Sequence, residues 1–126
     1  MINIIFSAIE NFHFCIMYKV MGNIWIEGKK GAFVGAGRVK LLERVKETGS
    51  ITEAARSIKM SYRQAWELIN SMNKQAKKPL VIRLVGGAGG GGTTVTKEGE
   101  KIIREYRKIQ DRFEKFVSDE TKKLEL

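Results

Sequence analysis

The amino-acid sequence predicts a mainly α-helical domain that also carries a β-hairpin, an α+β fold, and three observations lead to this prediction. Capping boxes begin at Ser50 and Ser61, eleven residues apart, and each opens a short amphipathic segment. Two segments rich in β-branched residues flank a glycine run at residues 86–92. A long amphipathic segment then follows Lys97. Two short helices, a tight turn and a following hairpin make a winged helix-turn-helix, here with a long C-terminal helix.

Residues 1–21 form an N-terminal extension that is rich in Ile, Phe and Met and is interrupted by Glu10 and His13. Its uninterrupted apolar runs are shorter than the roughly 20 residues that span a bilayer. It also lacks the basic start and the small-residue cleavage site of a secretory signal. We therefore expect a cytoplasmic protein with no membrane association. Met17 and Met21 are alternative start positions, so a translation start placed too far upstream is the competing interpretation.

Residues 22–96 are expected to form the winged helix-turn-helix domain, which opens with a hairpin and a helix. Asn23–Glu27 alternates apolar and polar residues, and Ala32–Val34 follows a Gly-Lys-Lys-Gly turn. A helix is predicted over Arg38–Thr48, because its apolar positions share one face opposite charged residues. Gly49 suits the left-handed residue that ends such a helix.

Each capping box predicts a helix start. The Ser50 hydroxyl can accept a hydrogen bond from the amide of Glu53, whose carboxylate can reach back to the amide of Ser50. Ser61 begins the same arrangement, with Gln64 in place of the acid. The first helix turns two adjacent alanines inward, which lets the second helix pack closely, and Lys59-Met60 is expected to form the turn between them.

The second helix is predicted over residues 62–74. Pro79 prevents its continuation, and residues 80–85 and 93–96 are expected to pair as the wing hairpin, with the glycine run at its tip. Thr96 can cap the last helix. Helical spacing places five side chains of the second helix toward the core, with Trp66 a core residue and not a stacking residue: Tyr62, Ala65, Trp66, Ile69 and Met72.

Residues 97–126 are expected to form a C-terminal dimerisation helix. Its apolar residues are spaced by four, three, four and three positions, as in the seam of a coiled coil. After Gly99 the segment contains no proline or glycine. The sequence therefore predicts a homodimer with a seam of five residues: Ile102, Tyr106, Ile109, Phe113 and Phe116.

The charge balance favours a polyanionic partner. The 126-residue chain has 23 Lys and Arg against 14 Asp and Glu, a net charge of +9. Such an excess promotes association with phosphates, because bound counterions are released. The single cysteine, Cys15, cannot form an internal disulfide, and one Cys with one His leaves no ligand set for zinc. We expect double-stranded DNA as the partner, and no cofactor and no metal.

A helix-turn-helix places its second helix in the major groove, where its N-terminal side chains reach the base edges. Arg63 is the strongest candidate, because a guanidinium can bond bidentately to guanine, and Gln64 can do the same to adenine. Hydroxyls and lysines suit phosphate contacts. The full set of expected DNA-binding residues is Lys59, Ser61, Tyr62, Arg63, Gln64, Glu67, Asn70, Ser71, Lys74, Lys77, Lys78, Arg83, Gly89 and Gly90.

Two other function classes compete with DNA binding: a nucleotide-binding enzyme and a protein-interaction module. Gly87-x-Gly89-x-x-Gly92 matches a dinucleotide fingerprint, but the fingerprint requires a helix to start at its last glycine, and Thr93–Val95 instead predicts a strand. The chain contains no Gly-x-Ser-x-Gly and no His-Glu-x-x-His motif, so a nucleotide-binding enzyme is disfavoured. A protein-interaction module with the same fold, whose charge serves solubility, is the competing interpretation.

The segment GRVKLLERVKETGSITEAARSIKMSYRQAWELINSMNK, followed by PLVIR, GGAGGGG and Thr-x-x-Gly, resembles the DNA-binding domain of the molybdate-responsive transcription regulators, the ModE family. The specific parts are Met60–Trp66 and the glycine-rich segment at residues 86–92. This resemblance spans about Ile24 to Tyr106. A less extensive likeness to LysR-type regulators covers Gly49 to Gly99, through Ala54-Ala55, Pro79-Leu80, Arg83 and Thr96-x-x-Gly99.

The resemblance implies a winged-helix dimer that binds a palindromic operator, with residues 62–74 in the major groove and the wing beside them. Full-length ModE-type regulators carry oxyanion-binding domains after the winged helix. This sequence ends at Leu126 with a charged helix, so we expect no molybdate or other oxyanion site from this chain alone.

Overall fold

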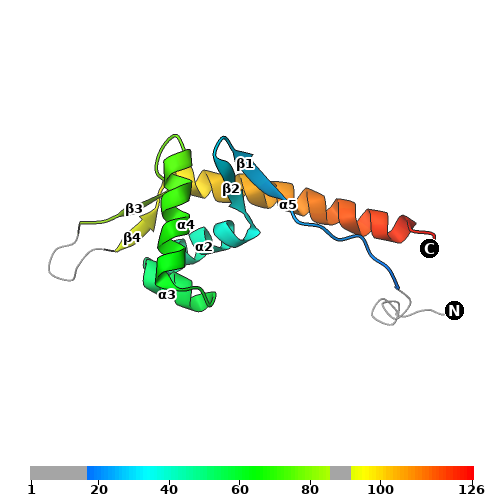
Figure 1. Ribbon diagram of the computed structural model, residues 1–126, viewed down its shortest axis with the longest axis horizontal. Coiled ribbons are helices and arrows are strands. Elements are labelled where there is room, and N and C mark those ends of the chain that lie inside the picture. Colours follow the sequence, from blue (N-terminus) through cyan, green and yellow to red (C-terminus); the bar gives the residue numbers. More distant parts are fainter. Residues whose placement is uncertain (1–16, 86–91) are drawn as a thin grey trace. The chain divides into compact units, whose positions relative to one another are not determined.

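The computed structural model describes residues 17–85 and 92–126. Contacts divide the chain into two compact units. One unit is Ile24–Gln110, and in the described part of the chain the other joins residues 17–23 to Asp111–Leu126. The first unit contains all the β-strands of the described chain and the short helices (Figure 1). The long C-terminal helix contributes residues to both units.

The first unit opens with the antiparallel strands β1 (Trp25–Gly28) and β2 (Gly31–Gly35). Helix α2 (Ala36–Thr48) begins directly after β2 and turns Val39, Leu41, Leu42 and Val45 into the core. Its end agrees with the sequence-based prediction, because Gly49 has φ 69° and its N–H bonds to the carbonyl of Val45. An L-residue with a side chain adopts that left-handed conformation only at a cost.

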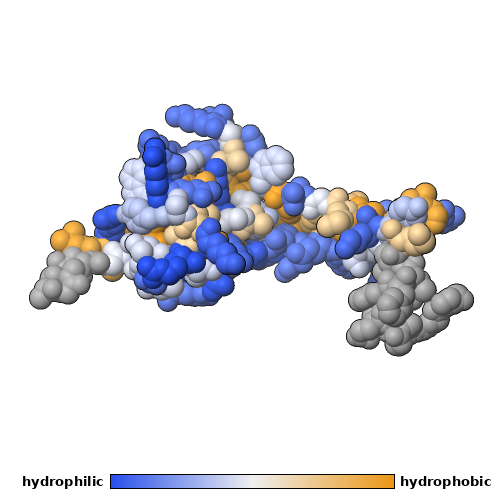
Figure 2. All heavy atoms as spheres, turned by 60° about the horizontal axis from the view of Figure 1, so that its bottom comes forward, coloured by the Kyte–Doolittle hydropathy of each residue, from blue (hydrophilic) through white to orange (hydrophobic). Residues whose placement is uncertain are grey.

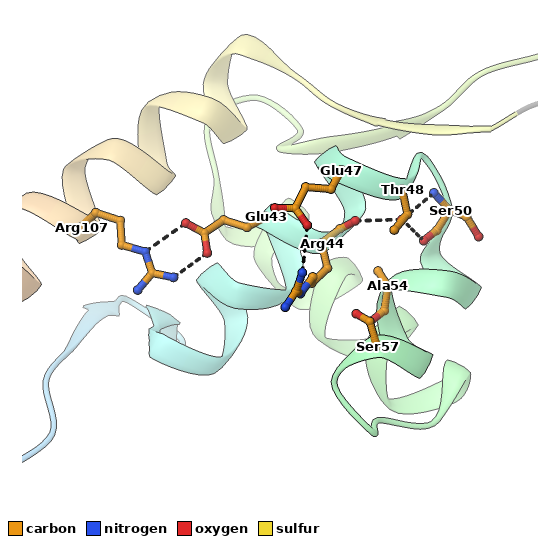
Figure 3. Close-up of polar contacts among 8 residues, drawn as sticks. All are labelled: Glu43, Arg44, Glu47, Thr48, Ser50, Ala54, Ser57 and Arg107. Atoms are coloured by element: carbon orange, nitrogen blue, oxygen red, sulfur yellow. Dashed lines mark hydrogen bonds and ion pairs between the residues drawn. The ribbon is translucent and has the colours of Figure 1, made fainter.

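Helices α3 (Ile51–Ser57) and α4 (Tyr62–Gln75) follow, each capped as predicted by a serine hydroxyl. Ser50 Oγ accepts from the amide of Glu53 at 3.1 Å. The return bond of the first capping box was predicted wrongly. The Ser50 amide donates to Thr48 Oγ1 at 3.2 Å (Figure 3), and the Glu53 carboxylate binds Arg56 at 2.7 Å. The Thr48 hydroxyl and the Arg56 guanidinium thus bind the amide and the carboxylate that were expected to bind each other.

Strands β3 (Val81–Arg83) and β4 (Thr93–Val95) pair antiparallel as the wing hairpin, which extends away from the helices in Figure 1. Their central pair is Ile82 with Thr94. The amide of Thr93 bonds to the carbonyl of Gly49 at 2.9 Å, so the end of α2 supports the base of the wing. This hairpin, after a helix-turn-helix, confirms the predicted α+β winged-helix class.

Helix α5 (Lys97–Lys123) is capped by Thr96, whose Oγ1 accepts from the amide of Gly99 at 3.1 Å. Within the first unit it contributes Tyr106 to the buried core, and Arg107 Nε bonds to Glu43 Oε2 of α2 at 3.0 Å (Figure 3). Within the second unit the rings of Phe113 and Phe116 stack, and Thr121 Oγ1 accepts from the amide of Val20 at 2.9 Å.

No helix in the described part of the chain is long and apolar enough to cross a membrane.

Candidate nucleic-acid interface

Helix α4 has one buried face and one exposed polar face. Ala65, Ile69 and Met72 face the core, and Leu68 packs partly against it. Ser61 Oγ accepts from the amide of Gln64 at 3.1 Å, which fixes the first turn of the helix. Because the apolar positions occupy one face, the polar residues of α4 point away from the core. The face of the first unit drawn in Figure 2 is mostly hydrophilic.

Arg63 is strongly exposed on that polar face, with 88% of its side chain accessible. Its Nε lies 3.2 Å from Glu67 Oε2, one turn further along. Such an exposed i, i+4 pair contributes little to stability, about 0.3–0.5 kcal/mol, so Arg63 can exchange this partner for a ligand at low cost. The carboxylate nevertheless holds the guanidinium over the first two turns of α4.

The other expected DNA-binding residues lie in several environments. Asn70 and Ser71 are half-buried on α4. Gly89 and Gly90 lie outside the described residues. The remaining members are exposed, and the lysines among them form no ion pair with any residue in the described part of the chain: Lys59, Ser61, Tyr62, Gln64, Lys74, Lys77, Lys78 and Arg83.

A hydrogen bond joins the N-terminal end of α4 to the wing. Arg83 Nη2 donates to the hydroxyl of Tyr62 at 2.9 Å. Both residues line an open cavity of about 370 Å³ between the start of α3 and the base of the wing. Hydroxyls of Ser50, Thr52 and Thr93 also line it. The cavity therefore collects one cation and several hydroxyl groups, which suits a phosphate.

Asn73 was not singled out by the sequence, although it holds the other end of α4 to the wing. Its Oδ1 accepts from the amide of Leu80 at 2.8 Å, and its Nδ2 donates to the carbonyl of Val81 at 2.9 Å. A side-chain amide thus completes the backbone bonding of a strand. An Asn seven residues before a predicted strand is a weak signal in a single sequence.

Two aromatic residues of α4 were predicted in the core, and both are exposed. Tyr62 is 45% exposed and Trp66 is 43% exposed. They lie four residues apart on the border of the apolar face, where α4 meets β3, whereas Ala65 and Ile69 take its centre. The spacing was consistent with burial, but a position on the border of the apolar face leaves each ring partly exposed.

The five residues of the expected dimerisation seam lie in different environments. Tyr106 is 1% exposed and its hydroxyl donates to the carbonyl of Ile24 at 3.0 Å, so it belongs to the core of its own chain. Ile102 packs against the same core, and Phe113 is half-buried. Ile109 and Phe116 are 39% and 56% exposed. A heptad pattern does not distinguish packing within one chain from packing between two, and here it includes core residues of this chain as well as exposed ones.

A second cavity, of about 390 Å³, lies against helix α2 in the first unit. Its lining includes Lys40, Arg44, Glu43, Glu47 and Arg107, and the last four pair with each other as Arg44–Glu47 and Arg107–Glu43. The hydrogen bond from Arg107 lowers the pKa of Glu43 below its usual value, with burial opposing it. Because four of its five charged residues are paired with each other, this cavity offers little to a charged ligand.

In residues 17–85 and 92–126, no group of three or more His, Cys, Asp or Glu side chains is placed to hold a metal ion.

A capped helix with an exposed arginine, held at both ends to a two-stranded wing, defines a winged helix-turn-helix protein. Residues 37–100, about half of the chain, match the family of bacterial regulatory helix-turn-helix proteins of the LysR type, and the chain belongs to this family. The match runs from the start of α2 to the first turn of α5. A crystal structure of a LysR family transcriptional regulator has the same fold, with a TM-score of 0.51 at 14% identity, over 66% of this chain and 27% of that one.

The resemblance to ModE proteins is confirmed by three relatives. The molybdenum transport protein ModE of Azotobacter vinelandii is 36% identical over 92 residues, 73% of this chain and 34% of that protein. The molybdenum-pterin-binding protein MopB of Rhodobacter capsulatus is 41% identical over 98 residues, 78% and 36% respectively. The DNA-binding transcriptional dual regulator ModE of Escherichia coli is 39% identical over 74 residues, 59% and 28%. The chain spans about a third of the length of these relatives.

Proposed function

We propose that this chain binds double-stranded DNA sequence-specifically as a homodimer and regulates transcription, with α4 in the major groove and the β3–β4 hairpin beside the phosphate backbone. The observation that carries the proposal is the exposed polar face of α4. This face presents Arg63 in the first turn of the helix, while the apolar face packs against the core. A major groove admits one α-helix, and a guanidinium there reads guanine.

The charges around α4 support this orientation. Lys59 precedes the helix, Lys74 ends it, and Lys77 and Lys78 follow it, all of them exposed. Arg83 adds a cation on the wing. Phosphates flank the major groove on both sides, so cations beyond each end of the helix and on the wing suit the backbone while Arg63 and Gln64 face the bases.

The dimer in this proposal uses the exposed residues of the seam, Ile109 and Phe116, with Phe113 beside them. Two copies related by a two-fold axis would present two α4 helices to half-sites about one helical turn apart. The names of two relatives refer to molybdenum. The proposal assigns this chain DNA binding only, since the matched part is about a third of each relative.

The test is a titration of the purified protein with fluorescein-labelled random duplex at several salt concentrations. We expect tight binding at low salt and a steep, linear fall of log K with log salt, with a slope near −0.9 for each phosphate neutralised. Absence of binding at low salt would refute the proposal and favour the protein-interaction module.

Selection from a random duplex library then gives a cognate site. Arg63→Ala should weaken binding to that site by about 1–3 kcal/mol and binding to random duplex much less. Lys77→Ala is the matched control, because a phosphate contact should weaken both duplexes equally. Equal losses for Arg63→Ala on both duplexes would make Arg63 a phosphate contact.

A further inference from the structure

Trp66 lies where helix α4 borders strand β3. Tyr62, four residues earlier, accepts a hydrogen bond from Arg83 of β3, and Asn73, seven residues later, donates to the carbonyl of Val81. Offsets of four and seven residues return to the same side of an α-helix. The indole therefore lies between the two links that join α4 to β3. We call this surface, formed by Tyr62, Trp66 and Arg83, the helix–wing junction.

The indole at this junction is available to a ligand. Trp66 is 43% exposed, and its N–H has no hydrogen-bond partner among residues 17–85 and 92–126. Trp25 differs, because its Nε1 donates to Glu27 Oε1 at 2.7 Å. An indole offers a flat apolar face and one donor at its edge. Arg83, which donates to the hydroxyl of Tyr62 one helical turn before Trp66, supplies a positive charge with no ion-pair partner in the described chain.

A surface that combines an apolar ring with a nearby cation matches the chemistry of a DNA strand, in which apolar deoxyribose faces alternate with phosphates. With a helix in the major groove and a wing beside it, one sugar–phosphate backbone passes between them. The junction lies at that position. The proposed function assigns base reading to the centre of the exposed face of α4, where Arg63 and Glu67 lie.

We propose that Trp66 contacts the sugar–phosphate backbone at the helix–wing junction, with its ring against deoxyribose and its N–H toward a phosphate. Tyr62 is a positioning residue that holds Arg83 for the adjacent phosphate. This inference rests on the proposed function. It assigns to Trp66 a contribution to DNA affinity that does not depend on the base sequence.

The test uses Trp25→Phe, which leaves Trp66 as the single tryptophan, since the chain contains two. Unlabelled random duplex is added while tryptophan emission is recorded, and fluorescein-labelled duplex reports binding by anisotropy in parallel. We expect the emission of Trp66 to change with the same midpoint as the anisotropy. Saturating anisotropy with unchanged emission would overturn the role of Trp66 and leave DNA binding standing. No anisotropy change would overturn both.

A second variant separates backbone contact from other roles. Trp66→Ala should bind the selected and the random duplex about three- to tenfold more weakly, by similar factors, with unchanged helical circular dichroism. Trp25→Ala is the matched control and should keep full affinity. A loss confined to the selected duplex would assign Trp66 to base reading, and no loss on either duplex, as expected for a docking site of another protein, would also overturn the proposal.

Discussion

At the scale of single residues, Lys59 adopts a backbone conformation that is typical of glycine. It has φ 57° in the turn between α3 and α4, and it is the non-glycine residue with positive φ in the described chain. The amide of Met60 bonds to the carbonyl of Ala55 at 2.9 Å, and the amide of Lys59 to that of Arg56 at 3.2 Å. This pairing is a Schellman motif, whose left-handed position glycine usually occupies.

Lys59→Gly should therefore stabilise the protein by about 0.5–1 kcal/mol, because the left-handed conformation costs glycine nothing. The same change should weaken binding to random duplex, since it removes an exposed cation. Chemical denaturation and duplex titration measure the two effects. Lys59→Ala is the control, with the same loss of affinity and no gain in stability. A destabilised Lys59→Gly would show that the lysine side chain itself supports the turn.

Individual side chains were the least predictable part of the candidate site. Arg63 could be identified from the sequence, because its place after a helix cap is local information. Trp66 and Tyr106 could not be placed, since the face on which they lie meets different neighbours in three dimensions. Apolar spacing predicted the core for Trp66 and a subunit seam for Tyr106, and the structure shows exposure for the first and burial for the second.

At the scale of elements, helix α4 and strand β3 are joined mainly by one side chain. The Asn73 amide bonds the backbone of Leu80 and Val81 on both its donor and acceptor sides. The contact resembles the edge of a sheet, with an asparagine in place of a strand. It fixes the base of the wing against the C-terminal half of α4.

Asn73→Ala should destabilise the protein by about 2–3 kcal/mol, because it leaves partly buried backbone groups of Leu80 and Val81 without partners. Urea denaturation measures this change. Asn70→Ala, one turn earlier, is the matched control, since Asn70 makes no side-chain hydrogen bond in the described chain. It should retain stability and lose affinity for the selected duplex. Equal stability of the two variants would contradict the clamp role of Asn73.

The elements themselves followed from the sequence, because their signals are local. Serine caps, the glycine after α2 and the β-branched segments around residues 86–92 predicted α3, α4 and the hairpin to within a few residues. The reciprocal half of the first capping box did not follow. It depended on Thr48 and Arg56, whose side chains compete for the same groups as the predicted partners.

At the scale of the whole molecule, the ion pair between Glu43 and Arg107 joins α2 to α5 within the first unit. The hydrogen bond from Arg107 lowers the pKa of Glu43 below its ordinary value of 4.5. The unfolded chain therefore binds a proton at this carboxyl before the folded chain does. The stabilisation is complete above the ordinary pKa and is lost as pH falls through the lower folded-state pKa.

Glu43→Gln should lower the free energy of unfolding by about 1 kcal/mol near neutral pH, with both side chains about one-third exposed and screened accordingly. The difference from the unmodified protein should shrink as pH falls below 4.5. Denaturant titrations over an acid pH series measure it. Glu47→Gln, in an exposed pair with Arg44, should change stability less. A difference in unfolding free energy that persists at low pH would contradict the assignment of this effect to the negative charge of Glu43.

The oligomeric state is the second property of the whole molecule. Changing both Ile109 and Phe116 to Glu should yield folded monomers, because both side chains are exposed and the charges would repel across a two-fold seam. Sedimentation velocity measures the mass, and circular dichroism checks the fold. Lys108→Glu with Lys115→Glu is the control on the exposed polar positions. Dimers that persist in the first variant would place the interface elsewhere.

Gly99 lies in the first turn of α5, where an added Cβ would stand 2.4 Å from the carbonyl oxygen of Leu80 and 2.6 Å from Val95 Cγ1. Helix backbone thus rests on the backbone at the base of the wing, with no side-chain layer between them. The missing side chain of Gly99 lets this turn pack against the carbonyl of Leu80 and the side chain of Val95. The first turn of α5 therefore sets the position of the wing directly, and any side chain at residue 99 would separate the two.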